Sequence, residues 1–223
     1  MLHNVGAANS LLTLHQRYGD EWFPVTTGYL IVRSLFETDV NAHYITMDRP
    51  ARARRYIEFG YVVRKNMFEA VARHLGSQKP SWREALQLMY EQELAPKKGQ
   101  IDANYDGVRS KFENVKGKRS SNWAGKSIRE MAKEVDHLEA YDIFYAELSS
   151  FAHGDVEFAN RFLKIRPDGP LWTQSASDYD VGSVFRYAAI FLDCFLELFG
   201  KEFGLWDSAE VLKCWDLPEA KTV

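Results

Sequence analysis

The chain has 223 residues, of which 46% are hydrophobic and 26% charged, and this composition excludes an intrinsically disordered protein. Its formal net charge of −3 gives no overall attraction to nucleic acid or to a membrane surface. The two cysteines, Cys194 and Cys214, form no metal-binding or redox pair. With no signal peptide over Met1–Ser10, we expect a cytoplasmic protein with free thiols.

Three helices are predicted in the N-terminal third of the chain. The first covers roughly Val5–Tyr18. The second covers about Pro24–Ile45, because proline suits a first helical turn. Asp48 is expected to cap the third helix, which ends at Gly76 because glycine favours a helix C-terminus.

Capping boxes predict three further helix starts. In such a box, a Ser or Asp and a Glu three residues later satisfy free N–H groups at the helix N-terminus. The boxes are Ser81 with Glu84, Ser127 with Glu130, and Asp136 with Glu139. Expected helix ends are Pro96, Gly154 and, for a long helix over Asp178–Phe199, Gly200, with a short helix near Ser208. Expected loops are Ala95–Ile101, Val115–Asn122 and Lys164–Ser177.

These elements predict an all-α fold, a bundle of about eight helices in a single domain over residues 1–223. Helices within 178–215 are expected to complete its core. The apolar segment Val181–Phe199 is interrupted by Arg186, Asp193 and Glu197. Because a bilayer-spanning helix needs about 20 mostly uncharged residues, this segment is predicted to be a buried core helix, and no membrane association is expected.

The helix around Arg33 carries a charged pair on its expected buried face. The residues that share this face are Tyr29, Leu30, Val32, Phe36, Val40 and Tyr44. Arg33 and Glu37 are four residues apart and can therefore pair. Two interpretations stay open: a buried ion pair that fixes helix register, or an Arg33 that binds phosphate or carboxylate while Glu37 orients it.

A second polar series, Tyr141, Tyr145, Ser149 and His153, repeats every four residues along one helix. The two tyrosines are also explained as core aromatics. His153 precedes Gly154 at the helix end, where the dipole favours an imidazolium. It is predicted to be either a capping histidine or a general acid–base, a role for which imidazole is suited.

The segment from Lys97 to Lys133 contains ten Lys or Arg and four acids, so it carries +6 while the remainder carries −9. Such asymmetry is typical of an anionic partner or of a solvated polar face. The candidate nucleic-acid-binding residues are Lys116, Lys118, Arg119, Trp123 and Lys126. In that hypothesis Trp123 stacks on a base, whereas in the alternative it is a hydrophobic plug.

Other catalytic signatures are missing from the sequence. No two histidines are spaced like zinc ligands, and there is no glycine-rich phosphate loop or nucleophile elbow. We therefore expect no metal and no cofactor.

The Arg33–Glu37 pair, the segment from Trp123 to Met131 and the helix carrying Tyr141 to His153 resemble a family of bacterial helical proteins known only as a domain of unknown function. The resemblance covers roughly residues 29–155. It implies a helical fold and no particular activity.

The chain is more distantly similar to the HEPN helical bundles, many of which are metal-independent ribonucleases of toxin and antiphage systems. Those enzymes carry an Arg four to six residues before a His, often at a homodimer interface. No arginine here precedes any of the six histidines at that spacing, so Arg33 would supply the group from another helix. The resemblance implies an endoribonuclease with catalytic Arg33 and His153. Glu37, Tyr145 and Ser149 would complete the site. The alternative is a non-catalytic binding or scaffold module in which these side chains form a buried network.

Overall fold

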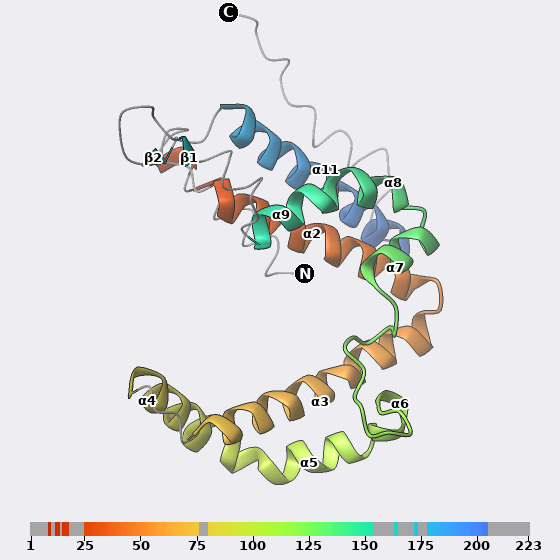
Figure 1. The fold of residues 1–223 in the computed structure, drawn as a ribbon. Coiled ribbons are helices and arrows are strands. Elements are labelled where there is room, and N and C mark those ends of the chain that lie inside the picture. Colours follow the sequence, from red (N-terminus) through yellow and green to blue (C-terminus); the bar gives the residue numbers. More distant parts are fainter. Residues whose placement is uncertain are drawn as a thin grey trace, which may run out of the picture. The chain divides into compact units, whose positions relative to one another are not determined.

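The computed structural model describes residues 9, 12–13, 15–17, 25–75, 80–153, 163–164, 172–173 and 178–204 (Figure 1). The chain divides into two compact units. Unit 1 comprises Met1–Thr46 and Ile128–Val223, and unit 2 comprises Met47–Ser127. The all-α fold is confirmed. The expectation of a single domain stays a prediction.

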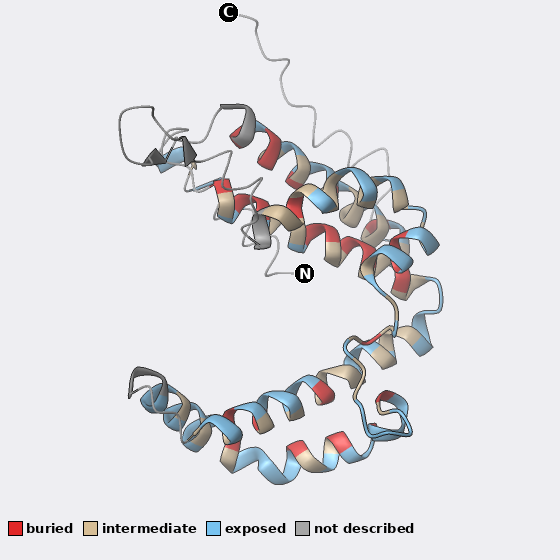
Figure 2. Cartoon of the chain, in the orientation of Figure 1, coloured by how far each residue is buried: buried red, intermediate tan, exposed pale blue. Residues whose placement is uncertain are grey.

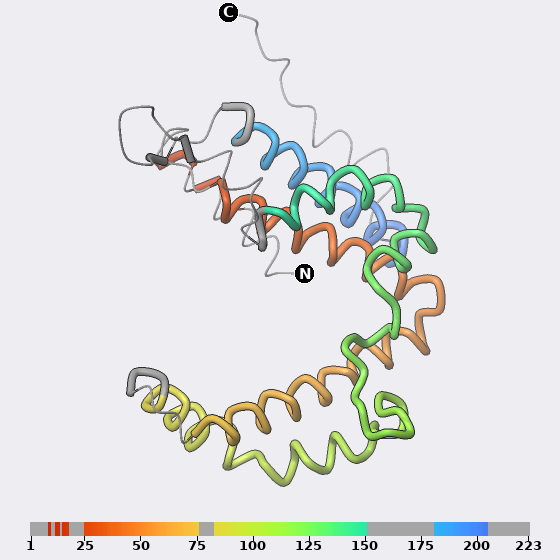
Figure 3. The backbone as a smooth tube through the Cα atoms, viewed as in Figure 1, coloured from red at the N-terminus to blue at the C-terminus, as the bar shows by residue number. Residues whose placement is uncertain are grey.

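Unit 1 is built around one helix, α2 (Val25–Thr46), against which three others pack. They are α7 (Ile128–Glu134), α9 (Ala146–His153) and α11 (Asp178–Phe203). Between α7 and α9 lie α8 (Leu138–Ala140) and a π-helical turn, η4 (Tyr141–Tyr145). Figure 3 traces α9 and α11 alongside α2, although 99 residues lie between α2 and α9 in sequence and more between α2 and α11. Two short strands, β1 (Leu163–Lys164) and β2 (Trp172–Thr173), pair antiparallel.

The core of unit 1 is aromatic. Phe36 of α2 is fully buried, and its ring centroid lies 5.1 Å from Phe191 of α11 and 5.8 Å from Tyr145 of η4. Phe144 contacts Phe191 at 5.9 Å. Edge-on and tilted ring pairs of this kind add to the burial of apolar area. Buried positions recur along α2 at helical spacing (Figure 2), as predicted for Tyr29, Val32, Phe36, Val40 and Tyr44. Leu30 was expected on this face but is exposed.

Unit 2 is built on α3 (Arg49–His74), which packs against a nearly continuous helical path. That path runs through α4 (Pro80–Met89), π-helical η2 (Tyr90–Leu94), 3₁₀-helical η3 (Ala95–Lys97), α5 (Lys98–Asp106) and α6 (Arg109–Phe112). The predicted loop Ala95–Ile101 is therefore wrong. Pro96 lies in the first turn of η3, where its missing N–H would have no intrahelical partner, so the chain stays helical.

Two apolar clusters hold α3 to this path. The first contains Val62, Tyr105, Val108 and Phe112, and the second contains Phe68, Val71, Leu94 and Ile101. After α6 the chain is irregular, as predicted for Val115–Asn122, and a single bridge joins Glu113 to Arg119.

Several predicted helix ends are displaced. The C-terminal helix continues past Gly200 to Phe203 and is followed by Gly204 at φ +61°, a left-handed conformation that favours glycine. Asp48 occupies the N-cap of α3 without a side-chain capping bond. Asp136 does not cap α8, because its φ is +62° and His137 is the N-cap.

Some predictions fall wholly or largely outside the described residues, namely the helix over Val5–Tyr18, the helix near Ser208 and most of the loop Lys164–Ser177. In the described part of the chain, no helix combines the length and the apolar character needed to cross a membrane.

Candidate functional site

Arg33, Glu37 and Tyr145 form a closed triangle of hydrogen bonds. Arg33 Nε donates to Glu37 Oε1 at 3.0 Å, and Arg33 Nη2 donates to the Tyr145 hydroxyl at 3.0 Å. That hydroxyl in turn donates to Glu37 Oε1 at 2.9 Å. One helical turn of α2 places the charged pair, and η4 brings the tyrosine to it across 108 residues of sequence. Three of the five predicted catalytic residues are thus in direct contact.

The triangle lies at the margin of the aromatic core. Tyr145 stacks on Tyr141 at 4.6 Å, and the Arg33 guanidinium lies 5.1 Å from the centroid of the Tyr145 ring. The Arg33 side chain is 22% exposed and that of Glu37 is 35% exposed, so the pair is partly buried rather than central to the core.

The polar contacts oppose the effect of burial on the guanidinium. Burial by itself would lower the pKa of Arg33, but the bonds to Glu37 and Tyr145 outweigh it and raise that pKa. Burial and the Glu37 carboxylate both raise the pKa of Tyr145. Arg33 is therefore a fixed cation and Tyr145 a neutral hydroxyl at physiological pH.

Arg33 keeps hydrogen-bonding capacity after these contacts. A guanidinium has five N–H donors, and the bonds to Glu37 and Tyr145 use two of them. Among the described residues, no other hydrogen bond from Arg33 is found. The cation is thus held in one orientation with donors left for an anion.

Ser149 and His153 follow Tyr145 on α9 by one and two helical turns. Within the described residues, Ser149 makes no hydrogen bond to Arg33, Glu37 or Tyr145. His153 is the last residue of α9, and its side chain lies outside the described residues. The structure therefore brings the first three predicted residues together and leaves the contribution of the other two as a prediction.

Sequence reasoning missed Asp39, the most deeply buried charged side chain among the described residues. Asp39 of α2 is 0% exposed, and two imidazoles contact it. His43 Nδ1 lies 3.2 Å from Oδ1, and His137 Nε2 lies 3.1 Å from Oδ2. His43 stands four residues after Asp39, the same spacing that revealed Arg33 and Glu37, so the contact between Asp39 and His43 was detectable from the sequence. His137, 98 positions away, gave no sequence signal.

Two cations of the predicted basic segment, Arg119 and Lys111, pair with acids of α3. Arg119 binds both carboxylate oxygens of Glu69, at 2.6 and 2.9 Å, and its Nε donates to the Tyr105 hydroxyl. These bonds raise the pKa of Arg119. Lys111 binds Glu58 at 2.6 Å. Arg119 is thus a structural cation of unit 2.

Trp123 does not fit the predicted role of stacking on a base. Its side chain is only 6% exposed, and its ring meets that of Tyr56 edge-on at 5.3 Å. Arg55 Nε donates to its carbonyl oxygen at 2.7 Å. The burial of the ring supports the plug interpretation. Lys116 and Lys118 are exposed, and Lys126 is half-buried.

The pKa of the Asp102 carboxyl group in unit 2 lies well below its ordinary value. Lys65 Nζ donates to it at 2.6 Å and Lys98 Nζ at 2.7 Å, and these two bonds lower its pKa from 3.8 to about 2. A carboxyl group with a depressed pKa in the folded state stabilises the fold above its unfolded pKa. That contribution is lost as the pH falls through the folded value.

We therefore expect the melting temperature to fall between pH 4 and pH 2, and more steeply in the wild type than in Asp102→Asn. Circular dichroism at a series of pH values measures this. Asp106→Asn removes an exposed carboxyl at the end of the same helix and should keep the wild-type profile. Equal slopes for wild type and Asp102→Asn would contradict the assignment.

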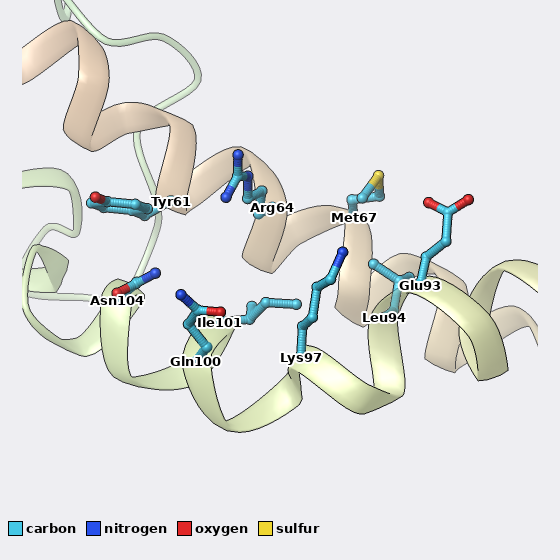
Figure 4. Close-up of a pocket in the computed structure, with 9 residues that line it drawn as sticks. All are labelled: Tyr61, Arg64, Met67, Glu93, Leu94, Lys97, Gln100, Ile101 and Asn104. Atoms are coloured by element: carbon cyan, nitrogen blue, oxygen red, sulfur yellow. The ribbon is translucent and has the colours of Figure 1, made fainter.

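Unit 2 also contains a pocket of about 270 Å³ between α3 and the η2–α5 path (Figure 4). Lys97, Gln100 and Asn104 extend toward α3, which contributes Tyr61, Arg64 and Met67. Its lining residues include no histidine, cysteine or serine. This pocket therefore offers polar contacts but no nucleophile–base pair.

Comparison with known families matches residues 7–170 to the family of unknown function DUF5677, and the chain belongs to it. This confirms the resemblance to a domain of unknown function and extends it beyond residues 29–155. No curated protein and no solved structure matches the chain.

Proposed function

We propose that this chain is a metal-independent endoribonuclease, similar to the HEPN enzymes, that acts on RNA in the cytoplasm. The family to which it belongs has no assigned function. The observation that carries the proposal is the Arg33 guanidinium, held by Glu37 and Tyr145, partly exposed, and left with unused donors. A planar cation in a fixed orientation suits the binding of a phosphate through two oxygens.

In this proposal Arg33 stabilises the charge that develops on the scissile phosphate. Glu37 and Tyr145 are positioning residues, because both hold the guanidinium. A donor fixed before the reaction pays no reorganisation cost when the negative charge grows.

His153 is proposed to accept the proton of the attacking 2′-hydroxyl and then to donate a proton to the leaving oxygen. An imidazole is suited to both steps near neutral pH. Ser149, one turn earlier on α9, would contact the bound phosphate. The exposed Lys116 and Lys118, together with the half-buried Lys126, would attract the RNA backbone. By the same HEPN similarity the protein would act as a homodimer in an antiphage or toxin system.

The test is cleavage of labelled total RNA in excess EDTA, with the fold checked by circular dichroism. We expect Arg33→Ala to slow cleavage roughly 100-fold or more, and His153→Ala to do the same. Arg33→Lys should restore little of the cleavage rate, because an ammonium lacks the planar pair of N–H donors with which a guanidinium binds two phosphate oxygens. Arg129→Ala is the matched control, since Arg129 is an exposed arginine of unit 1 that pairs with Asp142 at 3.2 Å, and it should cleave like the wild type. No cleavage by the wild type, or wild-type rates in Arg33→Ala, would reject the proposal.

One observation favours a second function, a non-catalytic binding module. The triangle closes on itself, so each of its side chains has a partner without any ligand. In that case Tyr145→Phe lowers the melting temperature while no RNA is cleaved by any variant. In the ribonuclease, Tyr145→Phe lowers kcat more than it raises KM, because a loosened guanidinium binds the transition state less well.

A further inference from the structure

The Asp39 carboxylate of α2 lacks the aligned hydrogen bonds that a buried charge requires. It is 0% exposed, and neither of its oxygens has a contact with the alignment of a hydrogen bond, although ring nitrogens lie 3.1 and 3.2 Å away. A buried carboxylate without aligned hydrogen bonds is costly unless a positive charge compensates it. The compensating charge is either a proton on an imidazole or a cation bound between these groups.

His137 is held with one nitrogen toward Asp39. Its Nδ1 lies 2.8 Å from the carbonyl oxygen of Val135, which only accepts, so Nδ1 carries the hydrogen. Nε2, 3.1 Å from Asp39 Oδ2, then carries either a second proton or a lone pair. A backbone carbonyl on one ring nitrogen is the usual way in which a metal-binding histidine is oriented.

The backbone before His137 is itself unusual. Asp136 has φ +62°, a conformation that costs a non-glycine residue free energy, and the N–H of His137 donates to the Ala132 carbonyl at 2.7 Å. This turn between α7 and α8 (Figure 1) directs His137 toward α2.

His43 completes a set of three ligands, two imidazoles and one carboxylate. It lies one turn after Asp39 on α2, and its ring centroid is 4.6 Å from that of His137. Its Nδ1 lies 3.0 Å from the backbone carbonyl oxygen of Asp39 and therefore carries the hydrogen, which leaves Nε2 as the nitrogen available to a metal ion. One ligand atom from each of Asp39, His43 and His137 lies within 4.8 Å of the others. Zinc–ligand bonds of about 2.1 Å place tetrahedral ligand atoms about 3.4 Å apart, so a modest closure of the side chains suffices.

We propose that Asp39, His43 and His137 form a binding site for one divalent transition-metal ion of the zinc class. Two imidazoles and one carboxylate suit zinc or cobalt, whereas magnesium and calcium prefer oxygen ligands. The ion would take the place of the proton beside the carboxylate and tie the α7–α8 turn to α2. This structural site goes beyond the proposed ribonuclease, whose reaction uses no metal.

The experiment uses the full chain with its purification tag removed, stripped with EDTA and then freed of chelator. Zn²⁺ is titrated against a chromophoric competitor, and Co²⁺ is followed by visible absorption. We expect one equivalent of each ion to bind. His137→Gln and His43→Gln should each weaken Zn²⁺ binding at least tenfold, and binding should raise the melting temperature of the wild type.

His74→Gln is the control, because it removes an exposed histidine of unit 2 and should leave binding unchanged. Circular dichroism establishes that each variant is folded, and two single variants are used so that the failure of one to fold leaves the other. Absence of stoichiometric binding by the wild type would assign the compensating charge to an imidazolium and overturn the proposal. Equal binding by the His43→Gln variant or the His137→Gln variant would overturn it too. Neither outcome depends on whether the protein cleaves RNA.

Discussion

His137→Ala is expected to lower the free energy of unfolding by about 3 kcal/mol, because it leaves a fully buried carboxylate with one imidazole instead of two. The Asp39 carboxylate shows how strongly its partners act. Burial would raise its pKa, yet the contacts with His137 and His43 outweigh burial and hold the pKa below its ordinary value. The same contact raises the pKa of His137. Removing the ring removes both effects at once.

Urea denaturation followed by circular dichroism measures the loss, with EDTA present so that bound metal makes no contribution. Asp39→Asn supplies the second edge of a double-mutant cycle. In the Asp39→Asn background, His137→Ala should cost less than about 1 kcal/mol, because no buried charge is left without a partner. The same loss in both backgrounds would mean that His137 acts through packing alone.

The helices of this protein were predictable because their determinants are local. Periodic apolar residues and Pro24 place α2 within one residue of its observed bounds. Pro96 is the instructive failure. A proline usually ends a helix, but its effect depends on its position in the turn, and here it lies in the first turn of η3. The π-helical turns η2 and η4 have no comparable local signature and were not expected.

The candidate site was likewise predictable where its residues lie at helical spacing in one segment. Spacing along one helix revealed the Arg33–Glu37 pair, and the repeat along the α9 region brought in Tyr145 through the family resemblance. Contacts between distant segments were not accessible in this way. His137 reads as an ordinary polar residue of a short connector, and only the packing of α7 on α2 brings it to Asp39.

Charge patterning was the weakest guide. The segment from Lys97 to Lys133 reads as a basic surface because the acids that neutralise it lie elsewhere in the sequence. Glu58 and Glu69 of α3 bind Lys111 and Arg119 in the folded unit. A net charge counted over a window therefore overstates the attraction that the surface offers to an anionic partner.

Phe36→Ala is expected to lower the free energy of unfolding by about 4 kcal/mol, since deletion of a fully buried ring removes its burial energy and leaves a cavity. The ring is enclosed from several elements, with Phe191 at 5.1 Å, Tyr145 at 5.8 Å and Tyr141 at 6.3 Å. None of these three aromatic side chains can fill the space without leaving its own contacts, so little collapse is expected.

Comparing the losses in unfolding free energy of two further variants shows how much of the Phe36→Ala loss comes from the cavity it leaves. Phe36→Leu keeps most of the apolar volume and should cost only about 1.5 kcal/mol. Ile190→Ala on α11 is the matched control, because that side chain is 42% exposed and its loss should stay below about 1 kcal/mol. Urea denaturation of the three variants gives the comparison. Equal losses for Phe36→Ala and Ile190→Ala would contradict the aromatic core of unit 1. Because Tyr145 packs on Phe36, the cavity would also loosen the side chain that holds the Arg33 guanidinium.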